Sequence, residues 1–173
     1  IELNPNFAEA HLNLGNILQK LGRLKEAESS TRRTIELNPN FAEAHLNLGN
    51  ILQKLGRLKE AESSTRRTIE LNPNFAEAHL NLGNILQNLE NFKEAENSDR
   101  KATQLKPNFN EAQIIFSIFL RNIGKLKDAE LYTRNAIKLY PGLAEFHSNL
   151  GGILISKGPV SYTHLRAHET QSD

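Results

Sequence analysis

The sequence has no cysteine, methionine or tryptophan, and aromatic residues account for only 6% of its 173 positions. A chain without cysteine can form neither disulfides nor thiolate metal sites, so its redox compartment is not determined and the cytoplasm is only a default expectation. Because aromatic residues are scarce, a hydrophobic core must be built mainly from Leu, Ile and Ala. The hydrophobic content of 38% is sufficient for such a core.

Charge of a single sign is also missing, since 21 Lys and Arg residues are balanced by 20 Asp and Glu residues. Opposite charges are interleaved along the chain, which gives no sustained field for a nucleic-acid backbone or an anionic membrane. No apolar run approaches the length that a bilayer requires, and no segment resembles a signal peptide. We therefore expect neither nucleic acid nor a membrane as a partner.

An internal repeat dominates what is present. The thirteen residues NPNFAEAHLNLGN occur three times without change, with a period of 34 residues, beginning at Asn4, Asn38 and Asn72. A fourth, drifted copy extends from Asn110 to Leu143, and a fifth begins at Ala144. Repeats of this length are typical of stacked architectures, because one unit cannot bury its apolar face alone. Since the chain begins at Ile1, inside a repeat and without Met, we interpret it as a fragment that has lost any targeting segment.

Each repeat contains two predicted helices. At the start of the first helix, Asn6 is the expected N-cap, and Glu9 completes a capping box. The apolar face of this helix recurs at helical spacing and consists of Leu14, Ile17, Leu18 and Leu21. Gly22 can adopt the left-handed conformation that closes a helix.

The second helix is amphipathic in the same way. Its inner side carries Leu24, Ala27, Thr31, Ile35 and Leu37. Its outer side carries opposite charges at a spacing of four, namely Glu28, Arg32 and Glu36. Pro39 ends the helix, because proline cannot continue the hydrogen-bond ladder.

This pattern resembles the tetratricopeptide repeat family. Four columns match the family pattern: Leu14, Gly15, Ala27 and Pro39. Large aromatic residues, usual in three other columns, are replaced by His11, Leu18 and Thr31. The small residues let the two helices approach closely, and the hydroxyls of Thr31 and Thr34, with their copies Thr65 and Thr68, are expected to bond to carbonyls of their own helix.

The resemblance implies an all-α fold, a right-handed α-solenoid of antiparallel helix pairs. It covers residues 1–158, with the end of a preceding repeat at 1–6, four full repeats at 7–143 and the first helix of a fifth at 144–158. The remaining segment, 159–173, departs from the repeat in composition and pattern, and it resembles translated sequencing-adapter sequence. The spacing of Val160, Thr163 and Ala167 nevertheless predicts a makeshift capping helix there.

The resemblance also implies a concave groove lined by the first helix of each repeat. Polar residues on that helix fall on one face at spacings of four, three and four. This predicted peptide-binding stripe consists of Glu9, Asn13, Asn16 and Lys20, then Glu43, Asn47, Asn50 and Lys54, then Glu77, Asn81 and Asn84. Because an Asn amide both donates and accepts, a row of Asn can pair with the backbone of an extended peptide. The row is similar to the asparagine ladder of the O-GlcNAc transferase repeats; a solvated polar face with no ligand is the alternative.

The fourth repeat changes the character of the stripe. Ile115 and Ile118 take the places of Asn, and Ile114 lies beside them in sequence. Exposed apolar patches usually mark contact sites, so we expect either an apolar anchor for a peptide or packing against another domain or copy. Phe116 and Phe119 fall in core columns.

Catalytic chemistry is not indicated. There is no phosphate-binding Gly-rich loop, and no nucleophile lies in a recognisable motif. A His column invites a metal interpretation, consisting of His11, His45, His79 and His147, but residues one repeat apart cannot easily share one ion. We expect these side chains to fill the place of an aromatic residue. The pair His164 and His168 lacks the Glu of a metalloprotease motif. We expect no enzyme activity, no metal and no cofactor.

Three hypotheses of function follow. The first is a protein interaction scaffold that binds an extended peptide in its groove. The second is the repeat arm of a larger glycosyl- or sulfotransferase, with catalysis in sequence outside this chain. The third is a structural or engineered array. Because the copies are identical, the front of one molecule can complement the back of another, which predicts head-to-tail self-association into open filaments.

Overall fold

A computed structural model describes residues 7–158 of the chain. Within that range the structure is all-α, in antiparallel helix pairs that repeat with a period of ~34 residues, and this confirms the predicted fold class. The helices are α1 (Ala8–Lys20), α2 (Leu24–Leu37), α3 (Ala42–Lys54), α4 (Leu58–Leu71), α5 (Ala76–Asn88), α6 (Phe92–Leu105), α7 (Asn110–Asn122), α8 (Leu126–Leu139) and α9 (Ala144–Ser156). The expected capping helix and the pair His164 and His168 lie outside the described residues.

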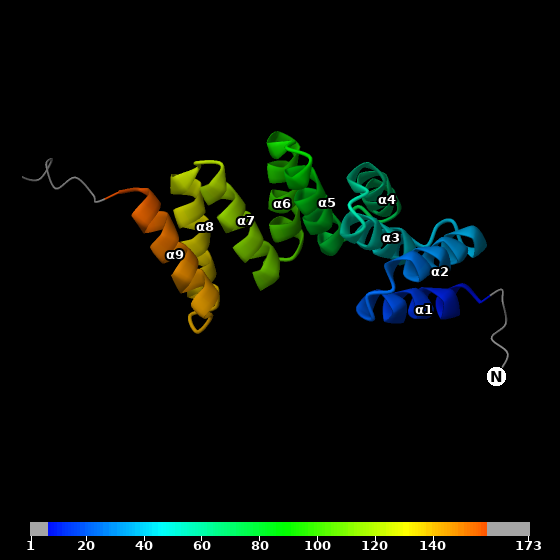
Figure 1. Ribbon diagram of the computed structural model, residues 1–173. Coiled ribbons are helices and arrows are strands. Elements are labelled where there is room, and N and C mark those ends of the chain that lie inside the picture. Colours follow the sequence, from blue (N-terminus) through cyan, green and yellow to red (C-terminus); the bar gives the residue numbers. More distant parts are fainter. Residues whose placement is uncertain (1–6, 159–173) are drawn as a thin grey trace, which may run out of the picture. The chain divides into compact units, whose positions relative to one another are not determined.

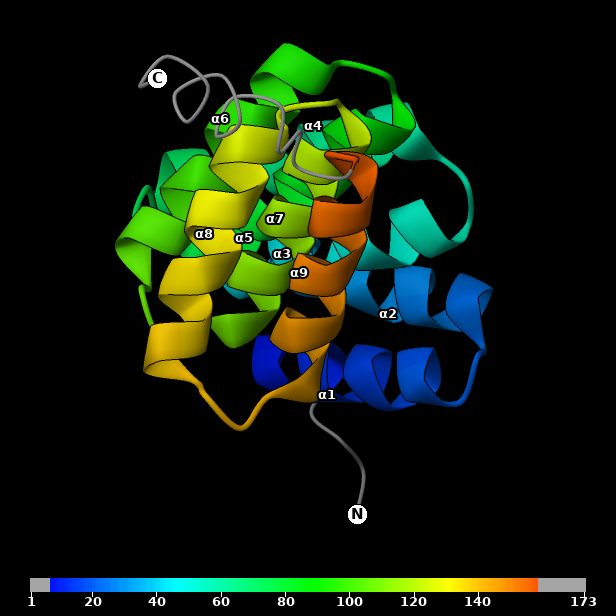
Figure 2. The ribbon, with the colours of Figure 1, turned by 90° about the vertical axis from the view of Figure 1, so that its left-hand side faces the viewer.

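The chain forms two compact units, Ile1–Pro107 and Asn108–Asp173. In the first unit α1 packs on α2, α3 on α4 and α5 on α6, and successive pairs meet where α2 packs on α3 and α4 on α5 (Figure 1). In the second unit α8 packs on both α7 and α9 (Figure 2). None of the helices between residues 7 and 158 is long and apolar enough to cross a membrane.

The helix closure predicted at Gly22 is confirmed. Its φ is 75°, its amide bonds to the Gln19 carbonyl at 3.1 Å, and the Arg23 amide bonds to the Leu18 carbonyl at 2.9 Å. These two bonds form a Schellman motif. The third repeat departs from it, because Glu90 occupies the glycine position with a φ of 60°. A side chain in this region costs about 1 kcal/mol relative to glycine.

The predicted capping box is wrong. Asn6 lies outside the described residues, but its copy Asn40 does not cap α3: the N-cap is Phe41, with no side-chain cap bond. Instead the Asn38 side chain accepts the Asn40 amide at 3.3 Å, so the polar residues stabilise the turn before the helix. The helix therefore begins one residue later than the capping pattern indicates.

The predicted apolar face is confirmed in the second and third repeats. Ile51 and its copy Ile85 are completely buried. In the first repeat only Leu18 of the predicted set is buried, and its Leu14, Ile17 and Leu21 are exposed. The sequences are identical, so the difference comes from neighbouring helices and not from the residues themselves.

Contact between the two helices of a repeat depends on a small residue facing a hydroxyl. The Thr31 hydroxyl donates to the Ala27 carbonyl at 2.8 Å, and Thr65 repeats this bond to Ala61, as predicted. A Cβ added at Gly15 would lie 2.6 Å from the Thr31 oxygen, so only glycine fits there. The Thr34 hydroxyl bonds to Ser30 in its own helix and also reaches the Ala8 carbonyl of α1 at 3.3 Å.

The third repeat places a carboxylate in this threonine column. Asp99 is completely buried against Gly83, and its Oδ2 accepts a bond from Gln87 at 2.8 Å. Its Oδ1 is buried without a hydrogen-bond partner. Burial raises the pKa of Asp99 to about 7, and the Gln87 bond only partly opposes that rise.

The second unit has a core built from Phe116 and Phe119, as predicted. Asn149 belongs to the same column as Asn47 and Asn81, yet it is only 5% exposed, and its side chain forms hydrogen bonds inside the protein. Its amide nitrogen donates to the hydroxyl oxygens of Ser117 and Thr133, at 2.7 and 3.2 Å, and Arg121 donates to its oxygen.

Candidate peptide-binding face

The predicted asparagine rows are brought together by neighbouring first helices. The amide nitrogen of Asn47 donates to the side-chain oxygen of Asn16 at 2.7 Å, linking α3 to α1. Asn81 and Asn50 make the same bond at 2.7 Å, linking α5 to α3. These four side chains are half-buried. We call the surface they share on α1, α3 and α5, together with Asn13 and Asn84, the amide face.

The predicted charged residues lie at the two ends of the same helices. Glu9 and Glu43 are in the first turns of α1 and α3, and Lys20 and Lys54 are in the last turns. All four are exposed. The third acid, Glu77, is half-buried and forms an ion pair with Lys106 at 2.7 Å, and this bond lowers the pKa of Glu77.

The predicted isoleucine patch is only partly assembled. Ile114 and Ile115 line a shallow cavity of about 200 Å³ together with Leu143, Glu111 and Glu145. Ile118 is half-buried and does not line this cavity. The choice between a peptide anchor and a packing surface therefore stays a prediction.

Two larger cavities, which the sequence pattern does not predict, lie between successive second helices. One, of about 620 Å³, has the apolar side chains of Ile35 and Leu48 and the charged side chains of Arg32 and Arg67 among its lining. The other, of about 450 Å³, is lined mostly by the equivalent positions one repeat later. Columns such as Ile35 and Ile69, or Leu48 and Leu82, place one member in each cavity, but the same spacing fits core packing equally well.

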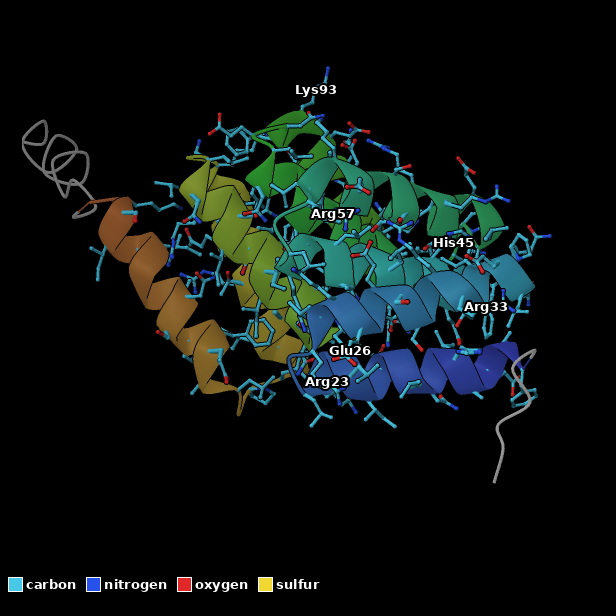
Figure 3. The ribbon with its side chains drawn as sticks, turned by 45° about the vertical axis from the view of Figure 1, so that its right-hand side comes forward. Arg23, Glu26, Arg33, His45, Arg57 and Lys93 are labelled. Carbon is cyan, nitrogen blue, oxygen red and sulfur yellow. The ribbon has the colours of Figure 1, made fainter. Side chains whose placement is uncertain are left out.

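The charges on the second helices and in the turns before them are paired with one another. Arg67 and Glu70, which line the first cavity, form one such pair at 2.9 Å. Arg23 binds Glu26 at the start of α2 (Figure 3), and the equivalent Arg57 binds Glu60. In both pairs the hydrogen bond from Arg lowers the pKa of the Glu. Arg57 also reaches back to Glu28 of the preceding repeat at 2.7 Å. The second helices therefore present neutralised charge and not a basic patch.

The histidine column has a role in the turn before each first helix. The Nε2–H of His45 donates to the Pro39 carbonyl at 2.9 Å, and His79 and His147 do the same one and three repeats later. His45 and His79 are half-buried, in keeping with the expected space-filling role, whereas His147 is exposed. Among the described residues no group of three or more His, Asp and Glu side chains could hold a metal ion.

Stacked helix pairs with a ~34-residue period define the class of helical repeat proteins. A tetratricopeptide repeat model matches residues 8–41 and 42–75, and a second model of the same description matches residues 65–97. These matches extend over more than half of the chain, so the chain belongs to the tetratricopeptide repeat family. No curated protein matches it.

Solved structures show the same fold. The crystal structure of YrrB, described as a tetratricopeptide repeat protein with an unusual peptide-binding site, is 25% identical and has a TM-score of 0.74, over 91% of this chain and 81% of that one. A MamA fragment from Desulfovibrio magneticus RS-1 is 19% identical with a TM-score of 0.77, over 91% and 88%. A mutant O-GlcNAc transferase from Thermobaculum terrenum is 23% identical with a TM-score of 0.72, over 77% of this chain but only 26% of the enzyme. Tetratricopeptide repeats generally bind proteins or peptides and are typically non-catalytic.

Proposed function

We propose that the amide face binds an extended peptide, with Asn13, Asn47 and Asn81 forming hydrogen bonds to the peptide backbone. The observation that supports this most is the pair of amide contacts at 2.7 Å between successive first helices. Each contact uses one N–H of Asn47 or Asn81. The second N–H and the oxygen of the same amide suffice to donate to a peptide carbonyl and accept from a peptide N–H.

The contacts give the two rows of asparagine different roles: the row of Asn47 and Asn81 would bind the peptide, and the row of Asn16 and Asn50 would orient the first row. Asn16 and Asn50 act as positioning residues, because they hold the amides of Asn47 and Asn81 in one orientation. A side chain fixed before binding loses less conformational entropy when the ligand arrives. A row of pre-oriented amides favours any extended backbone and places little demand on sequence.

Selectivity would come from the margins of this face. Glu9 and Glu43 form an acidic margin at one end of the first helices, and Lys20 and Lys54 form a basic margin at the other. Peptides with basic side chains on one edge and acidic side chains on the other would match both margins. The cavity beside Ile115 belongs to the second unit and is a separate candidate site for an apolar side chain.

Two comparisons support the proposal. The family generally binds proteins or peptides, and YrrB, which is similar over most of both chains, is described by its peptide-binding site. Neither identifies the residues that would contact a ligand here. The experiment must therefore separate the amide face from the cavities between second helices.

The test begins with selection of short random peptides that bind the full chain, followed by calorimetric titration of the strongest binder. Removing three amides by Asn13→Ala, Asn47→Ala and Asn81→Ala should weaken binding roughly a hundredfold, at about 1 kcal/mol net for each amide. A matched control with the same spacing on the second helices is Ser29→Ala with Ser63→Ala and Asn97→Ala, and it should leave the affinity unchanged. Circular dichroism checks that both variants fold.

A second arm tests whether the backbone is what binds. Methylating alternate backbone nitrogens of the selected peptide removes N–H donors and keeps every side chain. Binding should be lost on methylation, whereas shuffling the peptide sequence, which disturbs only the contacts with the charged margins, should weaken it much less. If instead the control triple loses binding, the ligand occupies the cavities between second helices and the proposal is wrong.

A further inference from the structure

The second unit contains a cavity at the start of its two first helices, α7 and α9, which pack on each other (Figure 2). The cavity of about 200 Å³ combines half-buried aliphatic side chains with exposed polar ones, and its lining consists of Ile114, Ile115, Leu143, Asn110, Glu111 and Glu145. The described lining includes two carboxylates but no Lys or Arg. A side chain that complements it is therefore apolar along its length and positively charged at its end.

Two changes from the repeat pattern make this cavity apolar. Leu143 takes the position that is Phe75 and Phe109 in earlier repeats, and leucine fills less space than a phenyl ring. Ile115 takes the position of Asn81, so an aliphatic side chain replaces an amide. The cavity therefore lies between two repeats that are both present in the structure, and it follows from the residues that the chain has there.

The third repeat shows how an acid in this column binds an ammonium group. Glu77 is the copy of Glu111 one repeat earlier, and the Nζ of Lys106 donates to its carboxylate at 2.7 Å. This bond lowers the pKa of Glu77. Lys106 is the C-cap residue of α6, and the equivalent residue after α8 is Tyr140. The Tyr140 ring stacks on Phe146 with the ring centroids 6.0 Å apart, so this position offers Glu111 no cation.

We propose that this cavity binds the side chain of a lysine on a partner protein. The aliphatic stem of that lysine lies against Ile115 and Leu143, and its ammonium donates to Glu111 and Glu145 in the way that Lys106 donates to Glu77. Lysine suits both parts of the lining because its stem is apolar and its charge is confined to the tip. The site is outside the amide face and does not depend on the peptide binding proposed there.

The test is methyl nuclear magnetic resonance of the full chain during titration with N-acetyl-lysine N-methylamide, here called blocked lysine. The methyl signals of Ile115 and Leu143 should shift saturably. The matching norleucine compound keeps the stem and lacks the ammonium. It should bind roughly fivefold or more weakly, because two exposed carboxylates each add a modest charge interaction.

Variants of the chain separate the contribution of shape from that of charge. Leu143→Phe restores the residue of the earlier repeats, so it should fill the cavity and abolish binding with no change of charge. Glu111→Gln with Glu145→Gln should weaken blocked lysine to the level of blocked norleucine and leave norleucine binding unchanged. The matched control is Asp128→Asn, which removes an exposed acid from α8 of the same unit and should have no effect. Circular dichroism checks that each variant folds.

The alanine triple variant of the amide face should bind blocked lysine normally, so failure of the amide face as a peptide site would leave this result unchanged. Three results would overturn the lysine site. The first is methyl signals of Ile115 and Leu143 that do not shift saturably. The second is equal binding of blocked norleucine and blocked lysine, which would make the site purely apolar. The third is a concentration-dependent shift of these signals in the unliganded chain, which would show that a second copy covers the cavity.

Discussion

Replacing Asp99 by Thr should stabilise the protein strongly at high pH and only weakly at low pH. The equivalent residues in the other repeats are Thr31, Thr65 and Thr133, and each donates its hydroxyl to a carbonyl one turn earlier at 2.8 Å. Asp99 is equally buried but leaves one carboxylate oxygen without a partner. Threonine would fill the same space with a bond that the fold already provides three times.

The magnitude follows from the pKa of Asp99. Burial raises the pKa from 3.8 to about 7 in the folded protein. Since the folded state binds the proton more tightly, stability is fully present below the pKa of the unfolded chain and is lost as pH rises through the folded value. The accumulated loss above pH 7 is about 4 kcal/mol. Asp99→Thr should recover about that amount near pH 8 and about 1 kcal/mol or less near pH 4.

The assay is urea unfolding followed by circular dichroism at both pH values, with the variant compared to the parent at each. Other carboxylates titrate equally in the two proteins, so the difference isolates Asp99. Asp99→Asn, which removes the charge and nearly keeps the shape, should recover most of the gain. Thr65→Asp should lower the free energy of unfolding at high pH by a similar amount, because it places a buried carboxyl in the second repeat. A gain that is absent, or equal at the two pH values, would refute the assignment of the cost to a buried ionised carboxyl.

Three further predictions concern packing and backbone. Glu90→Gly should raise the free energy of unfolding by about 1 kcal/mol, measured by urea titration, because it relieves the positive φ; no change would mean the strain is absent. Ile51→Ala should cost about 2–5 kcal/mol but the identical change at Ile17 less than about 1 kcal/mol, in thermal or urea unfolding; equal costs would contradict burial by stacking. Gly49→Ala should cost about 1–3 kcal/mol because a Cβ would clash with the Thr65 hydroxyl, and a double-mutant cycle with Thr65→Ala should show that the two changes are coupled and not additive.

Much of the fold follows from local pattern. The spacing of apolar residues predicts where the helices lie. Gly22 predicts a helix end because glycine can adopt a positive φ. The bond of the Thr31 hydroxyl to a carbonyl of its own helix follows from the short reach of a threonine side chain. The helix start was mispredicted because a side chain can stabilise the preceding turn instead of capping, and Asn38 does so. Both outcomes use the same residue types, so composition alone does not separate them.

The remaining features depend on neighbours that a local pattern does not contain. Ile17 and Ile51 have identical sequence surroundings, yet only the second is buried. Predicting that Asn47 pairs with Asn16 requires knowledge of how α1 and α3 are shifted along each other. The spacing of the asparagines within one helix does not contain that information. Asp99 could have been found, because it departs from an otherwise constant threonine column.

The most direct test of the proposed function is nuclear magnetic resonance of side-chain amides during titration with the selected peptide. Binding by the amide face predicts shifted, exchange-protected NH₂ signals for Asn47 and Asn81, with the signal of Asn97 on the second helices unchanged. Signals of Asn47 and Asn81 that stay in place at saturation, while that of Asn97 moves, would contradict it.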